Sequence, residues 1–148
     1  MTVQLALYKG RGQIGNAAIR WWANSAYSHC ELVVDGVCYS SSVMDGGVRR
    51  KEIDLSSENW DVVAVPWACT ERVLAYFAVT DSHRYGWPSL LLSQFLNLNR
   101  PVKGAEFCSE WCAAALGLPA PSSLSPHTLG EWVRFLGEPG HRPVVGPC

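Results

Sequence analysis

The chain has 148 residues, of which 48% are apolar and 17% charged, and its 12 basic and 13 acidic side chains give a net charge of −1. This composition is typical of one globular domain, and the near-neutral charge excludes a basic surface for nucleic acid or an anionic membrane. The apolar runs are far shorter than the roughly 20 residues of a membrane span. The N-terminus lacks a secretion signal, so we expect synthesis in the cytoplasm.

The first third of the chain is predicted to form a strand, a turn, a helix and a hairpin. Residues 3–8 are rich in strand-forming side chains, glycines interrupt residues 9–12, and residues 13–23 repeat apolar side chains at helical spacing. In residues 29–43, two β-rich runs flank Asp35-Gly36, a pair that favours a two-residue turn with positive φ. Counting outward from a Val34–Val37 pair, we expect two further opposed pairs whose side chains share one face: Glu31 with Ser40 and His29 with Ser42.

The rest of the chain alternates turns, strands and helices. A turn at 45–47 precedes strands at 48–55 and 60–65, the second interpreted as buried, and Arg49-Arg50-Lys51 is interpreted as a solvated strand edge. Helices are predicted at 70–83, 87–98, 107–116 and 126–136, with Thr70 and Ser125 as caps and Leu129, Trp132, Val133 and Leu136 inward on the last. We therefore expect an α+β domain over residues 1–136 with an antiparallel sheet, followed by a loosely held tail at 137–148.

Six cysteines raise three possibilities: a disulfide framework, a metal site or a reactive thiol. In a chain without a secretion signal we expect mostly reduced thiols, and the spacings do not suit zinc, so we predict no metal and no cofactor. Cys108 is placed in the first turn of its helix, where unpaired N–H groups stabilise a thiolate, and His29 is the best candidate base among four histidines. The alternative is that Cys108 is a small buried apolar residue and His29 is structural.

Four segments together resemble one family. They are LYKGRGQIG at 7–15, IRWW at 19–22, YSHCELVVDG at 27–36 and EFCSEWCAAALG at 106–117. They look like the circularly permuted branch of the NlpC-type peptidases, the YiiX-like papain-fold hydrolases, of which phage genomes carry short forms. The resemblance covers residues 5–136, and the order of a histidine hairpin before a cysteine helix marks the permuted branch. It implies a papain-like fold in which a small antiparallel sheet packs against the nucleophile helix.

The resemblance also implies roles for individual residues. Cys108 matches the nucleophile and His29 the base, while relatives carry an acidic residue where this chain has Ser42. Serine accepts the imidazole N–H but does not stabilise imidazolium as a carboxylate does, so Glu31 and Asp45 are alternatives for this third position. The backbone N–H of Cys108 is an oxyanion donor, with Tyr8 or Tyr27 as the second. Three tryptophans are candidates for a substrate groove, with the core as the alternative: Trp22, Trp87 and Trp111.

These features predict a cysteine hydrolase that cleaves an amide bond through an acyl-enzyme, and the resemblance implies peptidoglycan stem peptides as its substrate. One alternative is a phage virion or binding protein that keeps the fold with weak or no catalysis and contacts phage structural proteins. A second is a hydrolase or acyltransferase of lipid esters or thioesters. Without a secretion signal, access to the cell wall requires association with a virion or release on lysis.

Overall fold

The computed structural model describes residues 1–10, 26–42, 45–81 and 104–141, with only the backbone for 104–107. Two predicted helices, at 13–23 and 87–98, lie outside the described residues together with Trp22 and Trp87. Most of the predicted C-terminal tail lies outside them as well. The predicted α+β class is confirmed: within the described ranges, five antiparallel strands combine with three α-helices and one short 3₁₀ helix.

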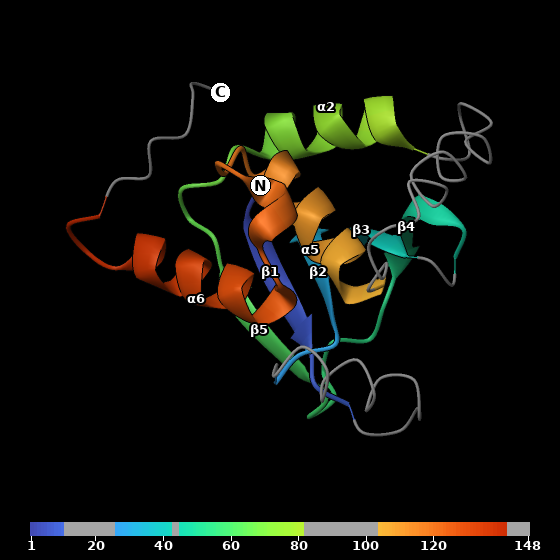
Figure 1. Cartoon of the computed structure of the whole chain (residues 1–148), viewed down its shortest axis with the longest axis horizontal. Coiled ribbons are helices and arrows are strands. Elements are labelled where there is room, and N and C mark those ends of the chain that lie inside the picture. Colours follow the sequence, from blue (N-terminus) through green and yellow to red (C-terminus); the bar gives the residue numbers. More distant parts are fainter. Residues whose placement is uncertain (11–25, 43–44, 82–103, 142–148) are drawn as a thin grey trace.

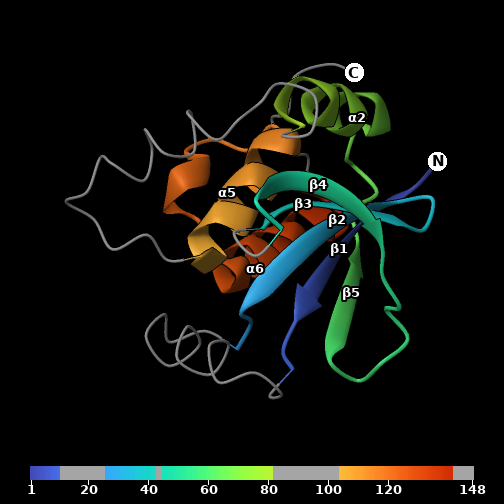
Figure 2. The same cartoon turned by 90° about the vertical axis from the view of Figure 1, so that its right-hand side faces the viewer.

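The sheet has the strand order β4-β3-β2-β1-β5. Its strands are β1 (Val3–Tyr8), β2 (His29–Val34), β3 (Val37–Ser42), β4 (Gly47–Glu52) and β5 (Trp60–Ala64). Each hydrogen-bonded neighbour is antiparallel, and the strands lie side by side in one curved layer (Figure 2). The prediction that residues 60–65 form a buried strand is wrong, because β5 lies at the edge of the sheet and Val62 is 41% exposed.

The β2–β3 hairpin forms at the predicted turn. Asp35 and Gly36 have φ values of 49° and 82°, the left-handed region that an Asp-Gly pair tolerates. Val34 pairs with Val37, and the ladder extends to Leu32–Tyr39. Beyond that point the hydroxyl of Ser40 donates to the carbonyl of Cys30 at 2.7 Å. The predicted pairs of Glu31 with Ser40 and His29 with Ser42 therefore lie past the end of the ladder.

The helices pack on one face of the sheet (Figures 1 and 2). They are α2 (Thr70–Thr80), α5 (Gly104–Ala115) and α6 (Pro126–Gly137), with the 3₁₀ helix η1 (Pro121–Ser123) before α6. Helix α5 crosses β2 and β3, whereas α6 lies against β1 and β5. Fully buried side chains between the layers, among them Leu5, Leu32 and Leu129, form the main core. None of the described helices is long and apolar enough to cross a membrane.

The ends of these helices confirm some predictions and correct others. Ser125 caps α6 as predicted, since its hydroxyl accepts from the backbone N–H of Thr128 at 3.2 Å. Thr70 is not a cap, because it is the first helical residue and Cys69 precedes it in the N-cap position. Helix α5 begins at Gly104, about one turn before the predicted start at 107. Cys108 therefore lies in the second turn of its helix.

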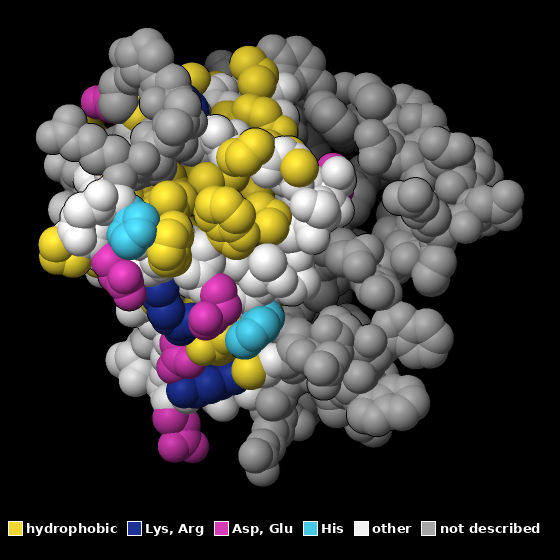
Figure 3. Space-filling model, turned by 60° about the vertical axis from the view of Figure 1, so that its left-hand side comes forward, with side chains coloured by type: hydrophobic (Ala, Val, Ile, Leu, Met, Phe, Trp, Pro, Cys, Tyr) yellow, Lys and Arg dark blue, Asp and Glu magenta, His cyan; other side chains and the backbone are white. Residues whose placement is uncertain are grey.

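One predicted inward residue of α6 faces outward. Trp132 is 44% exposed, and Phe135 on the same helix is 50% exposed. Figure 3, which brings the side of the molecule with α6 forward, shows apolar side chains gathered on this face. Leu129 and Val133, at the neighbouring helical positions, are fully buried against the sheet. The buried face of α6 is therefore narrower than the face that the apolar residues of the sequence predict.

Candidate active site

The fold brings Cys108 of α5 against His29 at the start of β2, although 79 positions separate them in the chain. Their side chains are hydrogen-bonded to each other. This contact exists because α5 packs across β2, so that its second turn lies beside the first residue of the strand. The Cys108 side chain is completely buried, while the imidazole of His29 keeps 24% of its surface exposed.

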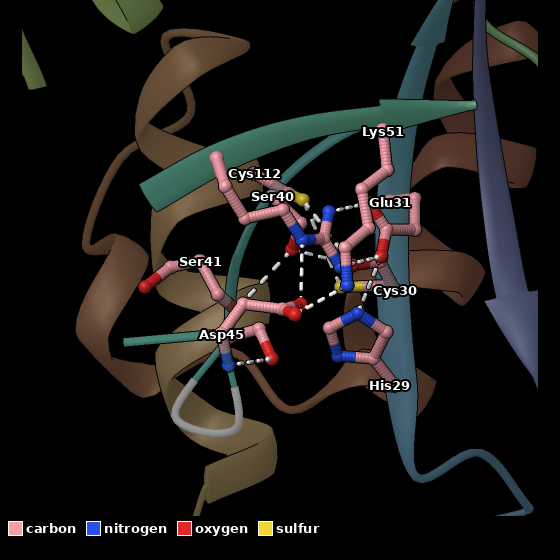
Figure 4. Close-up of polar contacts among 10 residues, drawn as sticks. His29, Cys30, Glu31, Ser40, Ser41, Asp45, Lys51 and Cys112 are labelled. Atoms are coloured by element: carbon pink, nitrogen blue, oxygen red, sulfur yellow. Dashed lines mark hydrogen bonds and ion pairs between the residues drawn. The ribbon is translucent and has the colours of Figure 1, made fainter. Parts of the chain in front are cut away.

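Glu31 holds the imidazole from the same strand. Residues two apart on a strand point to the same face, and the Oε1 atom of Glu31 lies 2.6 Å from Nε2 of His29 (Figure 4). Because Nε2 is engaged by the carboxylate, Nδ1 is the ring nitrogen left to face Cys108. Glu31 is completely buried, so this carboxylate acts on the imidazole in a medium that screens charge weakly. The three side chains form a thiol–imidazole–carboxylate series.

Arg49 holds the far side of that carboxylate. Its Nη1 and Nη2 atoms donate to the two oxygens of Glu31, each at 2.6 Å, and its Nε donates to Asp45 at 2.8 Å. Asp45 also receives a hydrogen bond from Lys51. The interpretation of residues 49–51 as a solvated edge is wrong for Arg49, whose side chain is only 7% exposed. β3–β4 pairing sets Arg49 opposite Ser40, on the face that Glu31 occupies.

The charges around the pair favour the ionised thiol. Burial by itself raises the pKa of Cys108, but a hydrogen bond from the Cys30 thiol and the positive charge of His29 lower it to about 5. Burial opposes the charge of His29, yet the thiolate of Cys108 and the carboxylate of Glu31 raise its pKa to about 10. Between these values the pair is a thiolate and an imidazolium. This is the form in which a cysteine is nucleophilic and a histidine can give a proton.

The two carboxylates of the network stay ionised near neutral pH. Burial raises the pKa of Glu31, but hydrogen bonds from Arg49 and His29 outweigh it and lower the pKa below its usual value. For Asp45, burial again raises the pKa, while Lys51 and Arg49 lower it to about 2. The negative charge of Glu31 is therefore available to stabilise the imidazolium of His29.

Two further thiols, which the sequence does not predict as site residues, lie beside Cys108. Sγ of Cys30 lies 3.8 Å from Sγ of Cys112, and both side chains are buried. The Cys30 backbone also hydrogen-bonds to Cys108. Burial raises the pKa of Cys30, so it remains a thiol and can donate to the Cys108 thiolate. Cys30 lies in the core between the sheet and α5, whereas His29 is the first residue of β2, where its side chain also reaches Cys108.

The described cysteines fit the expectation of mostly reduced thiols with one exception. Cys30, Cys38, Cys108 and Cys112 are thiols, whereas Cys69 is in a disulfide. No group of three or more His, Cys, Asp or Glu side chains that suits a metal ion is found in the described part of the chain.

Two predicted site residues have other partners. Ser42, the position that matches the family's acidic residue, is half-buried, and its hydroxyl accepts from the backbone N–H of Asp45 at 3.4 Å. The side chain that contacts Nε2 of His29 is Glu31. Trp111 is 95% buried, and its indole N–H donates to the hydroxyl of Thr80 at 2.9 Å. Its surroundings are those of a core residue, so the prediction of a groove at Trp111 is wrong.

The two tyrosines proposed as oxyanion donors differ in their surroundings. The hydroxyl of Tyr27 donates to Asp61 at 2.6 Å and accepts from Arg134 at 3.2 Å, which assigns it to holding β5 and α6 together. Tyr8 is the cross-strand partner of His29 and is half-buried against Trp60. Tyr8 is therefore the tyrosine that lies beside the candidate site.

The geometry of α5 argues against the backbone N–H of Cys108 as an oxyanion donor. The N–H groups that lack an intrahelical acceptor belong to the N-cap and the first three helical residues, so in α5, which begins at Gly104, the last of them is that of residue 106. The N–H of Cys108 comes after these and is placed to bond within the helix. The thiolate is stabilised instead by His29 and by Cys30.

No protein-family model, curated protein or solved structure matches this chain. The permuted NlpC-type fold and its activity thus stay predictions, carried by the motifs of the sequence.

Proposed function

We propose that this protein is a cysteine hydrolase that cleaves an amide bond, with Cys108 as nucleophile, His29 as general acid and base, and Glu31 as the carboxylate that orients His29. The observation that carries the proposal is the contact of Cys108 with an imidazole whose other nitrogen lies 2.6 Å from a buried carboxylate. A nucleophile, a base and an orienting group in series are the arrangement that acyl transfer requires.

The reaction has two halves. The thiolate of Cys108 attacks the carbonyl carbon, and the tetrahedral intermediate collapses as the imidazolium of His29 gives its proton to the leaving amine. This leaves a thioester between the acyl group and Cys108. Neutral His29 then takes a proton from water as the water attacks the thioester, and the acid product leaves with the thiolate restored. Glu31 remains ionised throughout and stabilises each imidazolium state.

Access to the sulfur is a condition of this reaction. Cys108 is completely buried and His29 is 24% exposed, so the imidazole is the part of the site that reaches the surface. A substrate carbonyl must approach along His29, and the groups that cover Cys108 must separate before attack. If the groups that cover Cys108 do not separate, the protein is the alternative named above, a binding protein that keeps the hydrolase fold without catalysis.

Peptidoglycan stem peptide is the substrate that we propose, on the resemblance to the permuted NlpC-type peptidases. The order of elements supports this resemblance, because the hairpin with His29 precedes the helix with Cys108 in the chain and packs against that helix. The papain-like identity of the fold belongs to the same proposal.

Incubation of the purified protein with peptidoglycan tests the substrate. We expect stem-peptide fragments by mass spectrometry from the wild type, none from Cys108→Ala, and unchanged release from Cys112→Ala, which removes a thiol one turn away on the same helix. Equal release by Cys108→Ala contradicts the enzyme proposal. If the wild type releases no fragments but its Cys108 reacts with alkylating reagents, peptidoglycan is not the substrate, and the proposal of a cysteine hydrolase stands.

A further inference from the structure

Arg49 is a buried arginine that the proposed reaction does not use directly. It lies on β4, two strands away from β2, and its guanidinium reaches Glu31 through two hydrogen bonds of 2.6 Å. The third donor, Nε, is held by Asp45 at 2.8 Å. With 7% of its side chain exposed, Arg49 lies beside the carboxylate and shares its Oε1 atom with the imidazole.

We propose that Arg49 is a positioning residue: it fixes the carboxylate of Glu31 against Nε2 of His29 and thereby holds the imidazole toward Cys108. This inference rests on the proposed function. The chain of contacts runs from Asp45 through Arg49, Glu31 and His29 to the thiol, with each link given by a hydrogen bond.

The geometry requires an arginine at this position. Glu31 Oε1 accepts from Arg49 and also contacts His29, so a rotation of the carboxylate breaks the contact with the imidazole. A planar guanidinium that bonds both oxygens fixes this rotation, whereas the single ammonium of lysine does not. Asp45 in turn fixes the guanidinium through Nε.

Arg49 also keeps Glu31 ionised. Burial favours the neutral carboxyl group, and hydrogen bonds from Arg49 are the first of the effects that oppose it. When Glu31 is neutral it no longer stabilises imidazolium, so the pKa of His29 falls and that of Cys108 rises. Loss of Arg49 should therefore move the acidic limb of thiol reactivity to higher pH.

The rate of alkylation of Cys108 by iodoacetamide, measured against pH, tests the inference. At about pH 6, we expect Arg49→Met to react about tenfold more slowly than the wild type, which is the effect of a rise of about two units from a thiol pKa of about 5. Arg49→Lys should fall between the two, because it returns the charge but not both hydrogen bonds. Arg50→Met, an exposed arginine at the next position of β4, should leave the pH profile unchanged.

A double variant separates positioning from folding. Arg49→Met leaves a buried carboxylate unpaired and can unfold the chain, whereas Glu31→Gln with Arg49→Met leaves no unpaired buried charge in this pair. If Arg49 acts through Glu31, the double variant reacts at the same rate as Glu31→Gln alone. A further tenfold loss in the double variant overturns the inference, as does a folded Arg49→Met with the wild-type profile.

The failure of this inference is distinguishable from failure of the proposed function. If wild-type Cys108 is no more reactive than an ordinary buried thiol, the hydrolase proposal fails. The imidazole of His29 still reports on Arg49 in that case, through the ring nitrogen shifts measured by NMR against pH. We expect its titration midpoint to fall in Arg49→Met, and an unchanged midpoint contradicts positioning by Arg49.

Discussion

Replacement of His29 by alanine is expected to lower the rate of amide hydrolysis by on the order of 10³-fold or more, while the protein stays folded. The imidazole stabilises the thiolate and supplies the proton to the leaving group, whereas the Cys30 thiol contributes only a hydrogen bond to the thiolate. His29 is the first residue of β2 and 24% of its side chain is exposed, so its truncation opens little of the core. The rate of fragment release and the far-ultraviolet circular dichroism spectrum measure the two effects.

The exposed His141 supplies the matched control, because His141→Ala removes an imidazole far from the site in the chain. It should hydrolyse substrate at the wild-type rate. Glu31→Gln should give an intermediate loss, since it removes the charge that stabilises imidazolium but keeps an oxygen near Nε2. A folded His29→Ala protein that retains full activity would rule out His29 as the acid and base.

The second large effect concerns the reactivity of Cys108 at low pH. With a pKa of about 5, the thiol is mostly ionised at about pH 6, so iodoacetamide should alkylate it there. Without His29, only the hydrogen bonds from Cys30 still oppose burial, so the pKa of Cys108 rises, and once it exceeds about 6 each further unit of pKa lowers the thiolate fraction at about pH 6 roughly tenfold. The sign is fixed: loss of the positive neighbour shifts the alkylation profile toward alkaline pH.

Another thiol of the same protein provides an internal reference for this experiment. Burial and the charge of Glu31 raise the pKa of Cys38 to about 11, so Cys38 should remain unlabelled at about pH 6 in all variants. Peptide mapping by mass spectrometry measures both sites at once. Equal labelling of Cys38 and Cys108 would mean that the fold does not activate Cys108.

The hairpin and the two central side chains could be predicted from the sequence because local chemistry specifies them. Asp35-Gly36 adopts the positive φ values that a two-residue turn needs, and this fixes the strands on either side. Cys108 and His29 were each chosen as the residue of its type with the most suitable local setting. Their contact depends on the packing of α5 on β2, which no local pattern contains.

The third residue was not settled by the sequence, since the choice depends on register beyond the end of a ladder. Ser42 matches the family's position and would lie opposite His29 if the β2–β3 ladder continued, but the pairing ends at Leu32–Tyr39. The imidazole is contacted instead by Glu31, two residues along the same strand as His29. Arg49 was assigned to a solvated edge because it stands among charged neighbours. On β4, Arg49 is buried and Arg50 is exposed, and only tertiary pairing shows which of the two faces Glu31.

The position of Cys108 in its helix changes how its thiolate is explained. A helix that starts near residue 107 would place Cys108 in the first turn, where unpaired N–H groups stabilise its thiolate. Helix α5 begins at Gly104 instead. Helix boundaries follow weak local signals, and an error of one turn removes the argument from the helix N-terminus. Contacts from His29 and Cys30, both on β2, replace it.

The most direct test of the central claim is the ionisation of Cys108 followed by the ultraviolet absorbance of its thiolate as the pH is raised. The signal of interest is the difference between the wild type and Cys108→Ala. We expect the thiolate to form with a midpoint near pH 5 and to be complete below neutral pH, with His29 protonated beside it up to about pH 10. A difference signal that first appears above about pH 9, as for an ordinary thiol, would contradict it.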